Sequence, residues 1–225
     1  MKGDSNINME KEIPTEKITK NTKIPNQQEV WEKIAEKWNE LKTIPGPAVE
    51  KFMQDKTGNI LDLGCGSGRN FLKNKGTIYG LDFSKKMLEH AKTKSEKENI
   101  KAELFFMEKE KIPFNDNFFD YSICIAVLHC LTKKEQIRLM KELYRVMKPQ
   151  SKSFISVWGR NSVKLRDKPK ECFVPWTIKR EEHISKEQRY TYIYEKEEFE
   201  QQVKEAGFKI LKSWEERNLN IIAEK

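Results

Sequence analysis

The stretch Ile60-Leu61-Asp62-Leu63-Gly64-Cys65-Gly66-Ser67-Gly68 constrains the fold of this chain more than any other part of it. It joins an apolar run to three glycines at alternate positions, a pattern that predicts a buried parallel strand turning sharply into a helix. Glycine is needed there because the turn requires unusual φ values and because a Cβ would keep a ligand away from the backbone. The stretch therefore predicts a ligand-binding turn in an α/β sheet.

Two acidic residues indicate which ligand the turn would hold. A dinucleotide site has the spacing G-x-G-x-x-G, whereas the spacing here is G-x-G-x-G, and Arg69 stands where the third glycine would be. The carboxylate of Asp62 would face a pyrophosphate, so a cationic ligand fits this turn better. Asp82 ends the next short apolar run, where a carboxylate can accept hydrogen bonds from both hydroxyls of a ribose.

This combination resembles the class I S-adenosylmethionine-dependent methyltransferases, although the glycines alone would also fit a turn of another α/β protein. The resemblance implies a Rossmann-like α/β fold with a seven-stranded sheet, mostly parallel with a C-terminal antiparallel hairpin, and helices on both faces. It implies S-adenosylmethionine as the cofactor, with its adenine amino group near Glu108. The residues that the resemblance assigns to the cofactor are Asp62, Gly64, Gly66, Gly68, Asp82, Phe83, Glu108, Lys109 and Ile125.

Length and composition limit the classes of protein. With 225 residues, the chain fits one α/β domain, and its 43 basic against 35 acidic residues favour a polyanionic partner. No run approaches the roughly 18 to 20 apolar residues of a membrane span, and the N-terminus lacks the apolar core of a signal peptide. We therefore expect a cytoplasmic protein without membrane association. Four cysteines and three histidines show no metal-ligand spacing, so no metal site is expected.

Hydrophobic periodicity predicts the order of the elements. Residues 1–25 show no sustained period and are predicted to be a disordered tail, followed by a single methyltransferase domain over 26–225. Ser84 and Thr132 are expected to cap helices. Helices are predicted over 26–41, 48–54, the residues after the glycine turn to about 73, 85–97, 133–148 and 196–206. Strands are predicted over 60–63, 77–81, 102–106, 154–158, 208–214 and 219–223, and a further strand with its exit loop over 118–129.

The segment 159–190 is basic and irregular, with aromatic residues interleaved. Basic side chains can neutralise phosphates, and aromatic faces can stack on splayed bases, so this insertion is predicted to recognise the substrate. A solvated loop with incidental lysines is the alternative.

Several segments together resemble the tRNA methyltransferases that esterify a carboxymethyl group on the wobble uridine. They are 30–35, 44–47, 122–129, 157–158, 173–176, 188–190 and 218–225. The resemblance implies a tRNA substrate bound at its anticodon region and a heterodimer with a small zinc-binding activator protein. The chain departs from the pattern at Cys130, Lys42 and Gly46, where histidine, arginine and tryptophan are usual.

The resemblance also implies a carboxylate acceptor, which is already ionised at neutral pH and needs no general base. It needs a cationic or hydrogen-bonding clamp, because an anion in a water-poor site is otherwise costly. We expect His129 and Arg160 to position it, although a loop histidine bonded to the backbone is the alternative for His129. The residues expected to bind the substrate are Lys42, Trp176, Arg189 and Tyr190.

Two other functions are compatible with the sequence. One is a methyltransferase of a quinone or another small metabolite. The other is a catalytically silent cofactor-binding module that serves as an RNA-binding or scaffold subunit.

Overall fold

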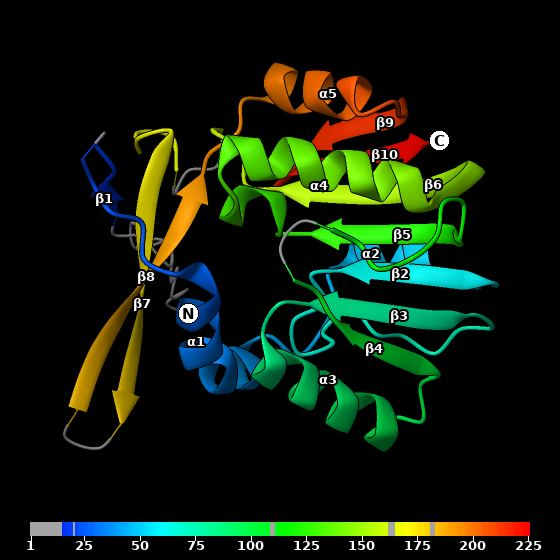
Figure 1. Ribbon diagram of the computed structural model, residues 1–225, viewed down its shortest axis with the longest axis horizontal. Helices are drawn as coiled ribbons and strands as arrows, with labels where there is room; N and C mark the ends of the chain where they lie inside the picture. Colours follow the sequence, from blue (N-terminus) through cyan, green and yellow to red (C-terminus); the bar gives the residue numbers. More distant parts are fainter. Residues whose placement is uncertain (1–14, 20, 109–110, 162–164, 181–182) are drawn as a thin grey trace, which may run out of the picture.

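A computed structural model describes residues 15–225 except 20, 109–110, 162–164 and 181–182. Its main sheet has seven strands in the order β4-β3-β2-β5-β6-β10-β9, and a smaller sheet has the order β1-β7-β8 (Figure 1). The strands of the main sheet are β2 (Asn59–Leu63), β3 (Thr77–Asp82), β4 (Ala102–Phe106), β5 (Phe119–Ile125), β6 (Met147–Val157), β9 (Lys209–Glu215) and β10 (Leu219–Glu224).

The pairing within the main sheet confirms the predicted fold class. Strands β2 to β6 pair in parallel, whereas β10 lies antiparallel between β6 and β9. The central strands are almost continuously apolar because parallel sheets are covered on both faces. The carboxyl ends of the parallel strands all point toward the β7–β8 hairpin (Figure 1).

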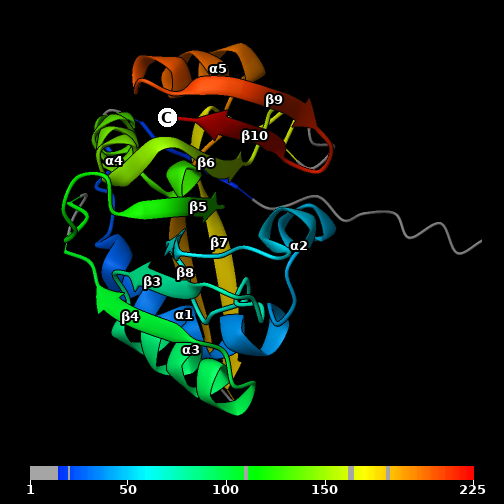
Figure 2. The ribbon, with the colours of Figure 1, turned by 90° about the vertical axis from the view of Figure 1, so that its right-hand side faces the viewer.

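Helices cover both faces of this sheet. They are α1 (Gln27–Leu41), α2 (Pro47–Met53), α3 (Lys85–Lys97), α4 (Lys133–Val146) and α5 (Lys196–Glu205), with the short 3-10 helix η1 (Leu128–Cys130). Figure 2 shows α4 and α2 on opposite sides of the sheet. Leu61 and Leu63 share a core with residues of α4 and α5, whereas Ile60 packs with residues of α2. This division follows from the alternation of side chains along β2.

The helix predicted after the glycine turn is absent. Residues 64–73 form successive turns, in which Gly68 N donates to Cys65 O at 3.0 Å and Phe71 N donates to Gly68 O at 3.0 Å. Gly64, Gly66 and Gly68 have φ values of +71°, +54° and +75°. Left-handed residues at alternate positions cannot continue an α-helix. The turn therefore offers a ligand its backbone and side chains, without the dipole of a helix N-terminus.

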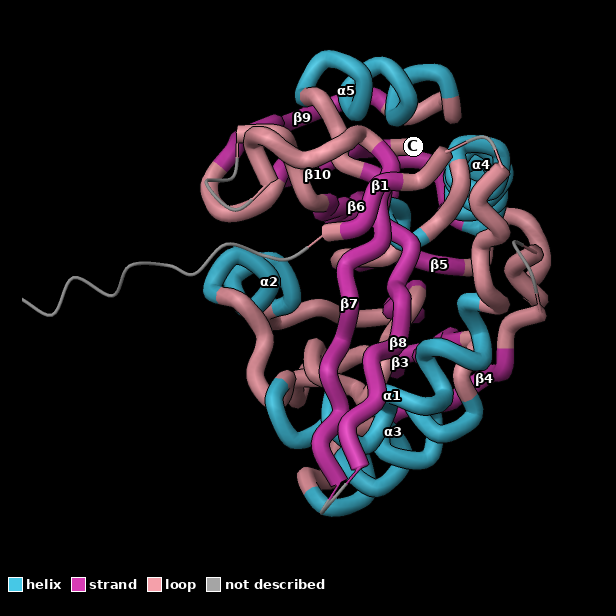
Figure 3. Tube along the Cα trace, turned by 90° about the vertical axis from the view of Figure 1, so that its left-hand side faces the viewer, coloured by secondary structure: helices cyan, strands magenta, loops and turns pink. Residues whose placement is uncertain are grey.

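The predicted insertion is not irregular. Most of it forms β7 (Glu171–Arg180) and β8 (His183–Tyr192), an antiparallel pair with continuous register. Figure 3 shows the two strands running side by side past α1. Apolar residues alternate along β7 at Cys172, Val174, Trp176 and Ile178, but Pro175 interrupts this signal and β8 is mostly polar, which weakens the prediction of a strand pair.

The predicted N-terminal tail also differs from the structure where its residues are described. Residues 16–17 form β1 (Glu16–Lys17), which pairs with Phe173 and Cys172 of β7. Ile18 and Ile24 pack against the core. So short a pairing rests on backbone hydrogen bonds, which leave no periodic signal in the sequence. Residues 1–14 lie outside the described part of the chain.

Candidate active site

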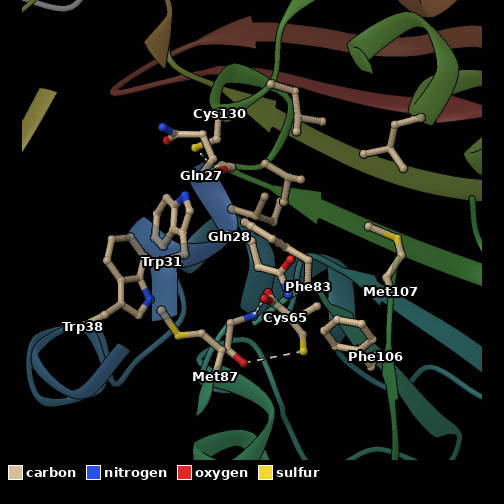
Figure 4. Close-up of a pocket in the computed structure, with 18 of the residues that line it drawn as sticks. Gln27, Gln28, Trp31, Trp38, Cys65, Phe83, Met87, Phe106, Met107 and Cys130 are labelled. Atoms are coloured by element: carbon tan, nitrogen blue, oxygen red, sulfur yellow. Dashed lines mark hydrogen bonds between the residues drawn. The ribbon is translucent and has the colours of Figure 1, made fainter. Parts of the chain in front are cut away.

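A cavity of about 620 Å³ lies at the carboxyl ends of β2, β3, β4 and β5, with α1 along one side (Figure 4). Ligands of open α/β sheets bind at this edge. Predicted cofactor residues that line it are Gly64, Gly66, Asp82, Phe83, Glu108 and Ile125. Asp62 and Gly68 lie behind this wall, and Lys109 lies outside the described residues.

Asp82 holds the glycine turn in place. Its Oδ2 accepts a hydrogen bond from Gly66 N at 2.8 Å, and its Oδ1 accepts one from Ser84 N at 2.9 Å. Burial raises the pKa of Asp82 to about 6, although the backbone N–H groups of Ser84 and Gly66 favour the charged form. Each carboxylate oxygen can accept more than one hydrogen bond. Asp82 can therefore hold the turn and still accept hydrogen bonds from hydroxyls of a ligand.

Asp62 is a buried carboxylate without a partner. The residue is 1% exposed, and within the described part of the chain neither of its oxygens accepts a hydrogen bond. Burial raises its pKa to about 7, opposed by the charge of Arg69. A buried, unpaired carboxylate is costly, and a ligand ammonium group placed beside it would remove that cost. With Arg69 lining the cavity next to it, this end of the site fits a zwitterionic amino-acid group.

The glycines of the turn differ in what they do. A Cβ on Gly64 would overlap the side chain of Val127, and one on Gly66 would lie 3.6 Å from Trp38 Nε1. Gly64 is therefore required by its close packing against Val127, whereas Gly66 leaves room beside the cavity wall. Gly68 instead packs against Phe71 and Ala91 of the protein interior, so its glycine serves packing rather than contact with a ligand.

Three predicted or aromatic residues lie together where α1 packs against the β7–β8 hairpin. The Cζ atom of Arg189 is 4.8 Å from the ring centroid of Trp176 and 5.9 Å from that of Trp31. Trp31 and Cys130 line the cavity, and the charge of Arg189 acts on Cys130. Two of the predicted substrate-binding residues, Arg189 and Trp176, are thus brought together next to Trp31 and Cys130 of the cavity wall, although neither lines the cavity itself.

His129 is buried, 3% exposed, and is not part of the cavity wall. Its Nδ1 accepts a hydrogen bond from Trp158 N at 3.2 Å, and its ring stacks on that of Trp158 with centroids 4.7 Å apart. Burial and the charge of Arg189 lower its pKa to about 3. The ring is therefore neutral and carries its proton on Nε2, which makes it a hydrogen-bond donor and a poor base.

The structure does not bring the other predicted residues to the cavity. Arg160 forms an ion pair with Glu195 at 3.0 Å and donates hydrogen bonds to the carbonyls of residues 165, 166 and 168. These contacts close the loop before β7 and hold the guanidinium there. The hydroxyl of Tyr190 donates to Glu171 at 2.8 Å, and its ring is buried in the core. Lys42 Nζ lies 6.0 Å from the ring centroid of Trp38, at the end of α1.

Several cavity residues were not predicted as site residues. They are Gln27, Gln28, Trp31, Trp38, Arg69, Asn70, Met87 and Cys130. Those of α1 had a sequence signal, because Gln27, Trp31 and Trp38 are spaced by four and seven residues and share one face of a helix. Both tryptophans on this face line the cavity.

We expect binding of S-adenosylmethionine, the ligand predicted from the sequence, to release protons near pH 6.5. The pKa of Asp62 is about 7 in the ligand-free site, so the carboxyl is largely protonated at that pH. A ligand ammonium would lower this pKa and drive the proton off. Calorimetry in two buffers with different ionisation enthalpies measures the release.

Asp62→Asn should remove most of the proton release and leave a smaller part from Asp82, whose pKa is about 6. At pH 8.5 both carboxylates are ionised with and without ligand and should release no protons, and binding should instead take up protons because the α-amino group of the free ligand is largely neutral there. A binding enthalpy at pH 6.5 that is the same in both buffers would contradict the assignment.

Comparisons with known proteins agree with this geometry. The "Methyltransferase domain" family model matches residues 60–150. A "Probable tRNA methyltransferase 9B" of Mus musculus is 32% identical over 152 residues, which are 65% of this chain and 32% of that protein. This chain thus spans about a third of the length of such mammalian relatives. A "tRNA (carboxymethyluridine(34)-5-O)-methyltransferase" of Schizosaccharomyces pombe is 28% identical and covers 88% of this chain and 95% of its own length.

Solved structures share the fold. A SAM-dependent methyltransferase from Aquifex aeolicus has a TM-score of 0.61 and 23% identity, covering 88% of this chain and 98% of its own. A Haloferax volcanii methyltransferase, solved in complex with the Trm112 activator, has a TM-score of 0.65 and 14% identity, covering 90% and 99%.

The site fits the cofactor of these proteins. Asp62 is a buried carboxylate that accepts no hydrogen bond from the described residues, Asp82 lines the cavity, and Gly66 leaves room beside the cavity wall. With the order of the strands and the matches above, these features show a methyltransferase domain over residues 60–150 in a chain with the fold of the class I S-adenosylmethionine-dependent methyltransferases.

Proposed function

We propose that this chain is a tRNA methyltransferase that transfers a methyl group from S-adenosylmethionine to the carboxylate of a carboxymethyl-modified wobble uridine. The Schizosaccharomyces pombe relative, which is matched over nearly its whole length, is named for that reaction. The excess of basic residues, a formal net charge of +8, suits a polyanionic substrate.

The observation that carries the proposal is the environment of Arg189. The residue is only 8% exposed, and no acidic side chain among the described residues forms an ion pair with it. Its Nε donates to Val174 O at 3.3 Å. Burial lowers its pKa, but an arginine stays charged at neutral pH. A buried cation without a counter-charge is costly, and an anionic acceptor group would supply one.

The cofactor supplies a methyl group on a sulfonium. A carboxylate oxygen of the acceptor would form the bond to the methyl carbon as the carbon–sulfur bond breaks, and no proton has to move. Arg189 would orient the carboxylate, and the buried His129, which lies outside the cavity wall, would stay neutral and accept no proton. The contribution of the protein is thus alignment and desolvation rather than acid–base chemistry.

This mechanism predicts that kcat, at saturating concentrations of both substrates, stays flat from pH 8 down to about pH 5.5. His129 has a pKa of about 3 and does not titrate in this range, and a carboxylate acceptor with a pKa near 4 stays ionised. The measurement is the pH profile of the wild type and of His129→Ala. A tenfold fall per pH unit below pH 7, abolished by His129→Ala, would instead identify His129 as a general base.

We also propose that the chain forms a heterodimer with a small zinc-binding activator protein. The Haloferax volcanii neighbour was solved in complex with the Trm112 methyltransferase activator. Within the described residues no cluster of His, Cys, Asp and Glu could hold a metal, which suits a metal carried by the partner. If the chain expressed alone is monodisperse, soluble and fully active, the partner is dispensable.

A small-molecule methyltransferase is the second candidate. A "2-phytyl-1,4-naphtoquinone methyltransferase" of Nostoc punctiforme is 33% identical over 145 residues, covering 60% of this chain and 56% of its own length. The aromatic wall of the cavity, formed by Trp31, Trp38 and Phe83, would suit a planar apolar acceptor.

Mass spectrometry of tRNA nucleosides from a deletion strain, with and without added enzyme, tests the proposed function. We expect the carboxymethyl nucleoside to accumulate in the tRNA of the deletion strain and its methyl ester to form when the enzyme is added to that tRNA. Turnover of a quinone with no change in the tRNA would favour the second candidate. Cofactor binding without turnover of either substrate would favour a non-catalytic subunit.

The described residues contain no helix that is long and apolar enough to cross a membrane.

A further inference from the structure

We propose that Gln27 is a positioning residue that holds the backbone on both sides of Arg189 and so sets where its guanidinium lies in the site. This inference rests on the proposed function for its catalytic meaning, because Arg189 is the group proposed to bind the acceptor carboxylate. The contact itself can be tested without any substrate.

The side-chain amide of Gln27 brackets Arg189. Its Oε1 accepts a hydrogen bond from Tyr190 N at 2.8 Å, and its Nε2 donates to Gln188 O at 3.2 Å. The same Nε2 donates to Pro25 O at 3.1 Å, which ties the start of α1 to the same point. One amide thus pairs with the residues immediately before and after Arg189, as a strand residue would.

These backbone groups belong to an unprotected edge. Among the described strands, β8 has β7 as its one neighbour in the smaller sheet. Gln188 O and Tyr190 N point to the same edge because backbone groups alternate along a strand, and that edge faces Gln27 rather than β7. Without the side-chain amide of Gln27, Gln188 O and Tyr190 N would each lose their hydrogen bond to the start of α1.

The two hydrogen bonds between Gln27 and β8 matter for Arg189 because side chains alternate along a strand. Arg189 faces Trp31 and Trp176, whereas the flanking Tyr190 faces the core. A shift of β8 by one residue would move the guanidinium to the other face of the hairpin. Gln27 and Trp31 are one helical turn apart on α1, and both line the cavity, as Figure 4 shows. One face of α1 therefore supplies both the amide of Gln27 that holds β8 and the ring of Trp31 beside the Arg189 guanidinium.

Three side chains at position 27 distinguish the possibilities. Gln27→Met keeps the length and removes both hydrogen bonds, while Gln27→Glu keeps the acceptor for Tyr190 N and loses the donor to Gln188 O. Gln201→Met is the matched control, since Gln201 is exposed on α5 and bonds only Glu205 among the described residues.

The first measurement is NMR on the full chain without substrate. In Gln27→Met we expect faster hydrogen exchange of the Tyr190 amide and a changed Arg189 Nε–H resonance, because the rings of Trp31 and Trp176 shift that signal. Gln27→Glu should keep the Tyr190 amide protected, and Gln201→Met should change neither signal. Unchanged exchange and an unchanged Arg189 signal in Gln27→Met would overturn the inference.

The second measurement is a double-mutant cycle on kcat/KM for tRNA bearing the carboxymethyl nucleoside. Gln27→Met should lower it about tenfold in the wild type and leave it nearly unchanged in an Arg189→Met background. The affinity for S-adenosylmethionine should stay within a factor of about two. Additive losses would overturn the positioning role. If Arg189→Met alone leaves kcat/KM unchanged, the proposed role of Arg189 in acceptor binding fails, and the NMR result still decides whether Gln27 holds this strand.

Discussion

Asp82→Ala is expected to weaken S-adenosylmethionine binding by about 1.5 to 3 kcal/mol, roughly a 10- to 150-fold rise in Kd. The carboxylate would accept hydrogen bonds from the ribose, and it also holds Gly66 N and Ser84 N in place. The substitution therefore removes ligand contacts and loosens the turn that carries them. Titration calorimetry on the folded variant measures the loss.

Two further variants separate these contributions. Asp82→Asn keeps the shape of the side chain and one oxygen acceptor, so its affinity should fall between those of the wild type and Asp82→Ala. Asp167→Ala, at an exposed position before β7, is the control and should bind the cofactor as the wild type does. Unchanged affinity in Asp82→Ala would show that this carboxylate does not hold the ribose.

The second large effect is expected from Arg189→Met. It removes the buried cation proposed to hold the acceptor carboxylate. The transition state should therefore lose about 1.5 to 3 kcal/mol of stabilisation, which lowers kcat/KM for the modified tRNA roughly 10- to 150-fold. Arg189→Lys should recover part of the activity, because it keeps the charge and loses the planar fork between the rings of Trp31 and Trp176. Steady-state kinetics with the modified tRNA gives the comparison.

A general loss of attraction for tRNA has a different signature. Arg217→Met removes one exposed positive charge from the turn between β9 and β10 and should change kcat/KM only slightly. Equal losses of kcat/KM in Arg217→Met and Arg189→Met would show that Arg189 acts only through the net charge of the protein. The affinity of Arg189→Met for S-adenosylmethionine should stay that of the wild type, which keeps this result independent of the one for Asp82.

Much of the architecture could be predicted from the sequence because its causes are local. Apolar runs ending in Asp62 and Asp82 are confirmed as β2 and β3, and Ser84 caps α3 through a hydrogen bond from Met87 N to its side chain. Thr132 and Glu135 form the capping box of α4. Each of these signals lies within a few residues of the structure that it specifies, so no distant part of the chain is needed to interpret it.

The errors arose where partners are distant in sequence or where local signals conflict. The three glycines indicated a tight turn but not that their left-handed backbone prevents a helix directly after it. In the hairpin, Pro175 interrupts the alternating apolar residues of β7 and β8 is mostly polar, so its strands were not predicted. Its pairing with β1 depends on residues more than a hundred positions away.

The candidate site also has one part that could be predicted from the sequence and one part that could not. The acids and glycines that suit the cofactor could be identified from the sequence, because their spacing along β2 and β3 brings them to one edge of a parallel sheet. Which of several arginines becomes the unpaired buried cation could not, since Arg160 and Arg189 differ only in their tertiary neighbours. Arg160 is neutralised by Glu195, whereas Arg189 is enclosed by two tryptophans and bracketed by Gln27. Burial and pairing of a charge are properties of the packed chain, so only the tertiary structure decided them.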